Sequence, residues 1–148
     1  MKLRRGLFAI TPFIFLCGCA APSNEGRVRG RMLETAQKSG SNAVVWEQRF
    51  IGCVTGYAKE HASADATPSE IAEAAASRCQ SEMDAFIGSM RIYYEESDGA
   101  TTRSLNEYAL VKQQAIAKSE NEGTDLATRG KQKAIATIID LKAMSRKP

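Results

Sequence analysis

The sequence contains little of the chemistry on which most enzymes and metal sites depend. Among its 148 residues there is one histidine, His61, and one tryptophan, Trp46. It has no G-x-S-x-G, H-E-x-x-H or glycine-rich phosphate loop. The acidic residues before Gly99 do not fit an EF-hand, because aligning this glycine with the sixth loop position puts Tyr94 at the first, where a carboxylate is required. We therefore expect no catalytic residues, no metal and no cofactor, and we interpret the protein as a non-enzyme.

Long apolar runs and a strong charge of one sign are also missing. No uninterrupted apolar run reaches the roughly 20 residues of a membrane-spanning helix, and a net charge of +3 does not suggest nucleic-acid binding. The net charge is divided unevenly, at +2 for residues 19–44, −7 for residues 45–125 and +5 for residues 126–148. The basic C-terminal segment is expected either to fold back on the acidic helices or to meet an anionic surface.

The N-terminal residues have the pattern of a secretory signal peptide. The basic residues Lys2, Arg4 and Arg5 precede a short apolar run from Leu7 to Leu16, which Pro12 interrupts. A proline inside the run argues against a helix of the mature fold. The pattern predicts export.

The end of this segment, Leu16–Cys19, reads LCGC and resembles the lipobox of bacterial lipoproteins. The resemblance covers only residues 1–19. It implies that Cys19 receives a diacylglyceryl group, that residues 1–18 are removed and that the new amine is acylated. Stable attachment to a membrane takes more than one acyl chain, which this processing provides. Ala20 after the cysteine resembles the lipoproteins sorted to the outer membrane, so the folded part is expected in the periplasm.

Other interpretations of this segment stay open. Cleavage after Ala20 or Ala21 would give a soluble periplasmic protein, and the lipid anchor could also remain in the inner membrane. A C-x-C metal site formed by Cys17 and Cys19 is excluded if Cys17 is removed with the signal peptide.

The sequence predicts a flexible tether over residues 19–43 and a helical domain over residues 44–148. Small, polar and glycine residues dominate the tether. Its arginines, Arg27, Arg29 and Arg31, would either touch anionic lipid headgroups or stay solvated. We favour solvated charge that keeps the tether extended.

Helical spacing and helix-start signals define the expected elements. The first helix carries an apolar stripe, after a cap at Ser41 or Asn42. Thr67 with Glu70 forms a capping box before a second helix that runs to the turn at 95–99. The expected stripes comprise Trp46, Phe50, Cys53 and Tyr57 in the first helix, and Ile71, Ala75, Cys79, Met83, Phe86, Ile87, Met90, Tyr93 and Tyr94 in the second.

Two further helices, or one long kinked helix, are expected in the last third of the chain. Ser104 with Glu107 forms a second capping box, with the helix beginning near Leu105. The third helix would end at residues 121–123, and a fourth helix would follow. Gly130 lowers the helix propensity of this fourth segment by ~1 kcal/mol relative to alanine. No strand-like alternation of useful length appears. The fold class is therefore all-α, a small bundle of three to four helices built on an antiparallel helical hairpin.

Cys53 and Cys79 are expected to form a disulfide. Both lie on apolar faces, and their midpoint, Ala66, falls in the expected turn, so they lie at the same height of an antiparallel hairpin. A pair of exported cysteines usually forms a bridge, and this one would contribute ~3 kcal/mol. Buried free thiols, a metal pair and a redox-active dithiol are the alternatives.

These observations favour a lipid-anchored binding or structural accessory of the cell envelope, with a protein partner. Trp46, Phe50 and Tyr57 are the candidate partner surface. An inhibitor or immunity-type lipoprotein that caps a toxin or hydrolase is the first alternative, since the acidic middle segment suits a basic target. An enzyme with an unrecognised site is the second. His61 is interpreted as a histidine at a helix end rather than a general base.

Overall fold

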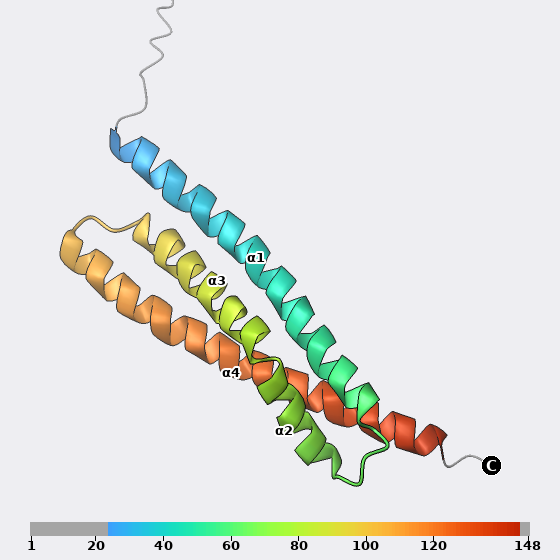
Figure 1. The fold of residues 1–148 in the computed structure, drawn as a ribbon. Helices are drawn as coiled ribbons and strands as arrows, with labels where there is room; N and C mark the ends of the chain where they lie inside the picture. The colour runs from blue at the N-terminus through green and yellow to red at the C-terminus, as the bar shows by residue number, and fades with distance from the viewer. Residues whose placement is uncertain (1–23, 146–148) are drawn as a thin grey trace, which may run out of the picture.

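The structure, a computed structural model, describes residues 24–145, and these form four helices without a strand. The elements are α1 (Asn24–Glu60), α2 (Pro68–Arg78), α3 (Gln80–Gly99) and α4 (Leu105–Met144) (Figure 1). The all-α bundle expected from the sequence is confirmed. The candidate lipidation site Cys19 and the signal segment 1–18 lie outside the described residues.

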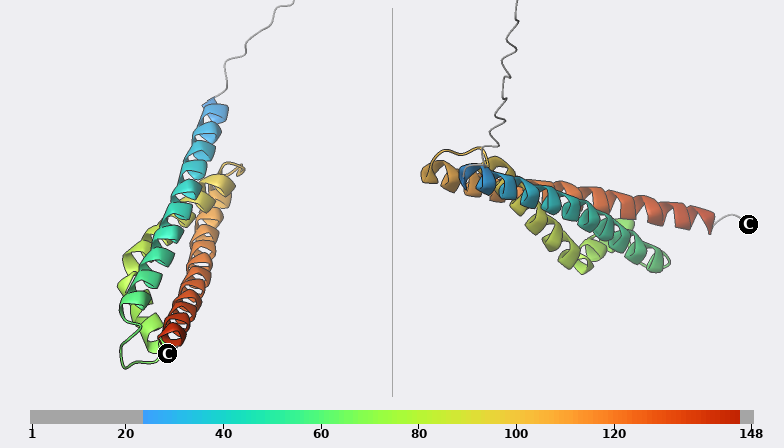
Figure 2. Two further views of the ribbon diagram at one scale, coloured as in Figure 1. Left: turned by 90° about the vertical axis from the view of Figure 1, so that its right-hand side faces the viewer. Right: turned by 90° about the horizontal axis from the view of Figure 1, so that it is seen from above.

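The chain runs along the bundle three times. Helix α1 descends, α2 and α3 return together in the opposite direction, and α4 descends again alongside them (Figures 1 and 2). The main contacts of α1 are with α3, while α4 packs against the other three helices. The N-terminus of α1 and the start of α4 therefore lie near one end of the bundle, and the C-terminus lies near the other.

The flexible tether expected over residues 19–43 is wrong for residues 24–43, which form the first half of α1. Ala36, Ser39 and Ala43 are buried there. Small residues were interpreted as poor core material, but here they let α3 approach closely: a Cβ built on Gly40 would lie 3.2 Å from the Tyr93 ring. The expected cap at Ser41 or Asn42 is wrong for the same reason, because both lie inside the helix.

Both capping boxes are confirmed. The Glu70 backbone N–H donates to Thr67 Oγ1 at 3.2 Å, and the Thr67 backbone N–H donates to Glu70 Oε2 at 2.8 Å. The backbone N–H and the hydroxyl of Thr67 both donate to Glu70 Oε2, and these two bonds lower the pKa of the Glu70 carboxyl below its usual value. Ser104 and Glu107 exchange the equivalent bonds at the start of α4. The side chains thus satisfy backbone donors that a helix N-terminus leaves unpaired.

The single second helix expected from residue 68 to the 95–99 turn is interrupted at Cys79, which separates α2 from α3. The backbone of Cys79 has φ −97° and ψ 22°, outside the helical region, although its N–H still donates to Ala75 O at 3.1 Å. Since neither proline nor glycine is present there, the sequence carries no local signal for this break.

Residues 105–144 form one helix, so the expected stop at 121–123 is wrong and the long-helix alternative holds. Gly123 and Gly130 are buried where other helices cross α4. A Cβ on Gly123 would lie 2.6 Å from Ile87 Cδ1, and one on Gly130 would lie 2.6 Å from Phe50 Cε1. These glycines serve as contact points for large neighbouring side chains, at the cost of some helix propensity.

The apolar core lies mainly in the half of the bundle that contains α2. Its largest fully buried apolar side chains are Phe50, Val54, Leu126 and Ile138. Early in α4 the large apolar side chains are not covered, because Leu105 is 87% exposed and Ile116 is also exposed, while the small Ala115 is buried. Large apolar residues thus fill one half of the molecule, and small ones line the helix contacts of the other.

Candidate functional site

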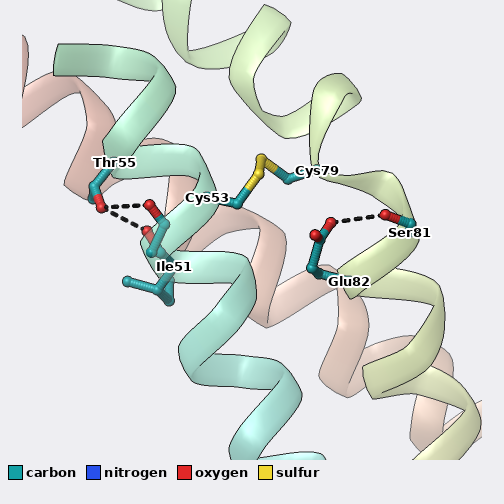
Figure 3. Close-up of a disulfide and its surroundings, with 7 residues drawn as sticks. Ile51, Cys53, Thr55, Cys79, Ser81 and Glu82 are labelled. Carbon is teal, nitrogen blue, oxygen red and sulfur yellow. Dashed lines mark hydrogen bonds between the residues drawn. A yellow bond between two sulfur atoms is a disulfide. The ribbon is translucent and has the colours of Figure 1, made fainter. Parts of the chain in front are cut away.

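The disulfide between Cys53 and Cys79 is present. It joins α1 to the break between α2 and α3, with a Cα–Cα distance of 6.0 Å (Figure 3). The Cys79 side chain is fully buried and Cys53 is partly buried. The bridge thus fixes the irregular junction of the returning segment against α1, and the disulfide is the interpretation that holds among those considered.

Of the three aromatic residues predicted as a partner surface, Phe50 does not lie on the surface, and Trp46 and Tyr57 are only partly exposed. Phe50 is fully buried, with its ring against Gly130, so its assignment to a surface is wrong. Trp46 is half-covered, with the Arg49 guanidinium 4.6 Å from its ring centroid. Tyr57 is half-buried and belongs with Trp46 to the margin of the core. The common helical spacing of these residues therefore marks core packing.

His61 lies directly after the last residue of α1. Its ring stacks on Tyr57 with centroids 3.9 Å apart, and its Nδ1 lies 2.9 Å from the Tyr57 carbonyl oxygen. Both contacts are local to the helix end. This position agrees with the interpretation of His61 as a histidine that terminates a helix.

A groove of about 860 Å³ lies at the end of the bundle where α1 begins. It is formed between the first turns of α1, the α3–α4 connection and the start of α4; we call this part of the molecule the groove end. The N-terminal turns of α1 extend past the α3–α4 connection, so their inner face is not covered by a neighbouring helix (Figures 1 and 2). The lining residues used below are Glu25, Val28, Arg29, Glu96, Arg103, Leu105 and Tyr108.

The groove combines apolar and charged side chains. Leu105, at 87%, is the most exposed of the large apolar side chains within residues 24–145, and Val28 is 48% exposed. Arg29 and Arg103 line the groove beside carboxylates. Such a surface suits an amphipathic partner rather than a wholly buried apolar ligand.

Tyrosine–carboxylate pairs hold the helices together toward this end. The Tyr108 hydroxyl of α4 donates to Glu95 Oε1 of α3 at 3.1 Å, and the Tyr94 hydroxyl donates to Glu122 Oε1 at 3.2 Å. Partial burial and the adjacent carboxylates raise the pKa of both phenols above the usual value. These pairs connect α3 to α4 where large apolar contacts are few.

The basic residues of α4 meet acidic residues of the other three helices. Arg129 Nη1 lies 2.6 Å from Glu47 Oε1 of α1, and Lys131 Nζ lies 2.7 Å from Glu73 Oε2 of α2. Of the two destinations considered for the basic segment, these contacts support folding back on the acidic helices. Two similar pairs to α3 are Lys118–Asp98 at 2.7 Å and Lys112–Glu95 at 3.1 Å.

A second exposed apolar surface lies along α1. Leu33 and Val44 are 53% and 54% exposed, and their separation of 11 residues places them on the same face of the helix. We call these two side chains the α1 outer stripe. These two side chains lie about 17 Å apart along the helix, so they are two separate exposed apolar points and not a contiguous apolar patch.

Neither a membrane span nor a metal cluster is found in the part of the chain that the structure describes. No helix within residues 24–145 is both long and apolar enough to cross a bilayer. Over the same residues, no group of three His, Cys, Asp or Glu side chains is arranged to hold a metal ion. Comparison with family models, with curated proteins and with solved structures finds no match to this chain.

Proposed function

We propose that the protein is a lipid-anchored component of a bacterial cell envelope that holds a rigid helical accessory domain in the periplasm and binds a protein partner there. The observation that carries the proposal is the position of the lipobox-like Cys19, five residues before the first residue of α1. An acylated Cys19 would attach one end of a bundle some 55 Å long to the outer membrane, at 1.5 Å per residue of the 37-residue α1.

The disulfide supports the export that this proposal requires. Disulfides persist in oxidising compartments such as the periplasm and are rare in a reducing cytosol. The Cys53–Cys79 bridge ties α1 to the break between α2 and α3, so it contributes to the stiffness of the domain. A stiff domain loses little conformational entropy when it binds, which favours a role as a docking module.

The α1 outer stripe is the surface we assign to the protein partner. Leu33 and Val44 are exposed along the length of α1 rather than at its end. The inhibitor alternative has weaker support, because it relied on the acidic segment: Glu47, Glu73 and two further acidic residues of that segment already pair with cations of α4.

The first experiment determines the mature N-terminus. The full chain is expressed in a Gram-negative host, and the membrane fraction is analysed by intact mass spectrometry. We expect a chain that begins at Cys19 and carries acyl groups, and a Cys19→Ala variant that is no longer acylated. A mature chain that begins after Ala20 or Ala21 without acyl groups would overturn the anchor.

The second experiment tests the partner surface. The lipidated protein is cross-linked in intact cells and purified from membranes, in parallel with a Val44→Asp variant and an Ile139→Asp variant. Val44 and Ile139 are equally exposed, at 54%, but lie on different helices. We expect one stoichiometric partner that is lost with Val44→Asp and retained with Ile139→Asp. Absence of a partner from the unaltered protein, or its loss from both variants, would contradict the assignment.

A further inference from the structure

We infer that the groove end is a membrane-docking surface, at which Leu105 and Val28 enter the lipid interface and the neighbouring arginines contact anionic headgroups. The inference rests on the proposed anchor at Cys19. In this arrangement the bundle is attached to the bilayer by the acylated Cys19 and also contacts it through a defined set of side chains.

The length of chain before α1 limits where this end can lie. Cys19 and Asn24 are five positions apart, with four residues between them, and an extended chain of five steps spans at most about 17 Å. The acylated Cys19 is held at the level of the headgroups. The first turn of α1, and with it the groove, must therefore stay within this distance of the bilayer, whereas the C-terminal end of the bundle can lie more than 50 Å away.

The exposed apolar side chains of this end match a lipid interface. Leu105 is 87% exposed at the very start of α4, and Val28 lies across the groove from it on α1. An aqueous environment makes such exposure of a leucine unfavourable, and an interface removes it. Side chains placed at one end, on two different helices, are arranged to enter a surface together.

The charges at this end suit an anionic bilayer. Arg27, Arg29 and Arg31 lie in the first turns of α1, and Arg103 lies in the α3–α4 connection. Among residues 24–145 none of these arginines forms an ion pair within 4.0 Å, in contrast to four cations of α4. The nearby carboxylates are those of Glu25 and Glu34 on α1 itself and of Glu96 and Glu107, and the last of these accepts the backbone N–H of Arg103 at 2.6 Å. A basic residue near an anionic surface strengthens binding, and the effect is screened by salt.

The test measures which end of the bundle contacts lipid. Trp46 is the only tryptophan and lies about 33 Å along α1 from Asn24, so Trp46→Phe gives a chain without background fluorescence. A Leu105→Trp substitution in this chain introduces a reporter at the groove end. The matched control is Ile139→Trp, also at an exposed apolar position of α4 but about 50 Å further along the helix.

Each lipidated full-length variant is placed in vesicles of phosphatidylethanolamine and phosphatidylglycerol with brominated acyl chains, which quench tryptophan on contact. We expect the Leu105→Trp reporter to lose more than half of its fluorescence and the Ile139→Trp reporter to be unaffected. Equal quenching of both reporters, or quenching of neither, would overturn the docking surface. Circular dichroism confirms that the variants are folded.

A second arm tests the arginines. Arg27→Gln, Arg29→Gln and Arg31→Gln are combined in the Leu105→Trp chain, and the control removes the same charge elsewhere with Lys59→Gln, Arg78→Gln and Lys133→Gln. We expect at least a twofold loss of quenching in the chain that lacks the three arginines and no loss in the control chain. The Leu105→Trp chain with its arginines intact should show the same twofold loss in vesicles of phosphatidylcholine. Unchanged quenching in both cases would overturn the contact with anionic headgroups.

The mass of the same samples separates the two proposals. Acyl groups on Cys19 together with an unquenched Leu105→Trp reporter would overturn the docking surface and leave the anchor intact. A chain without acyl groups would overturn the anchor, and the docking surface that rests on it.

Discussion

The two ends of the bundle are held together by different kinds of contact. Toward the end formed by α2, the second half of α1 and the second half of α4, large apolar side chains such as Phe50, Leu126 and Ile138 are fully buried, and a disulfide joins two segments. At the groove end, helix contacts rest on small residues, tyrosine–carboxylate pairs and surface ion pairs. One end thus has the buried contacts that give stability, and the other has exposed apolar and charged side chains.

This difference predicts that equivalent substitutions have unequal effects at the two ends. Buried apolar area dominates the free energy of folding, whereas exposed ion pairs contribute little. The following substitutions test the comparison in order of decreasing effect.

The largest difference is expected between Phe50 and Leu105. Phe50→Ala removes a fully buried ring and should lower the free energy of unfolding by about 3–5 kcal/mol. Leu105→Ala removes an exposed side chain and should change the same quantity by less than about 0.5 kcal/mol. Urea denaturation followed by circular dichroism measures both. Similar losses for the two variants would show that the ends do not differ as described.

The disulfide comes next. The double variant Cys53→Ala/Cys79→Ala releases a loop of 26 residues and should lower the free energy of unfolding by about 3 kcal/mol. Hydrogen exchange should show lost protection around α2 and unchanged protection around the start of α4. Thiol alkylation of the unreduced protein provides the control, since two alkylated cysteines per chain would show that the bridge is not formed in solution.

Glycine substitutions should have opposite signs at two positions. Gly130→Ala places a methyl group 2.6 Å from the Phe50 ring and should destabilise the protein by about 1–3 kcal/mol. Gly52→Ala adds a methyl group where no atom lies within 4 Å and should stabilise it by about 0.5–1 kcal/mol. Thermal unfolding compares the two variants. Adding Phe50→Leu to the Gly130→Ala chain should recover part of the lost stability, because the shorter side chain relieves the clash with the new methyl group.

The smallest effects on the free energy of unfolding are expected for the two tyrosines toward the groove end. Tyr108→Phe and Tyr94→Phe each remove one hydrogen bond to a carboxylate and should cost about 0.5–1.5 kcal/mol. Because the folded pKa of each phenol is raised above its unfolded value, this contribution is fully present below about pH 10 and is lost as the pH rises through the folded pKa. Ultraviolet titration of the phenolates measures the pKa. The Phe variants should lose less stability than the unaltered chain on going to high pH, and an identical loss would contradict the pairing.

The sequence predicted the fold class, the two capping boxes and the disulfide. The fold class and the capping boxes depend on short-range patterns. Thr67 with Glu70 is a local signal for a helix start, and it needs no knowledge of the tertiary structure. The disulfide followed from symmetry about the turn, which is a property of any antiparallel hairpin.

The errors occurred where packing between helices overrides local propensity. The sequence of residues 24–43 resembles a loop because it is rich in small residues, and Gly123 resembles a helix stop. Closely packed helices require small residues at their contacts, however, and this is the role these residues have. Phe50 was assigned to a surface because periodicity identifies a face without telling what covers it. The groove was not predicted, since it depends on how far α1 extends past the α3–α4 connection.

The bridge between Cys53 and Cys79 spans the whole connection from α1 to α2, residues 61–67, in which Ser63, Ala64 and Asp65 are exposed. A protease that cuts this connection would open the chain without dividing the molecule, because each fragment keeps one of the two sulfur atoms. The nicked protein would migrate as one species on a non-reducing gel and as two on a reducing gel. A protein built in this way keeps its N-terminal helix joined to the rest of the bundle even after this exposed connection has been cleaved.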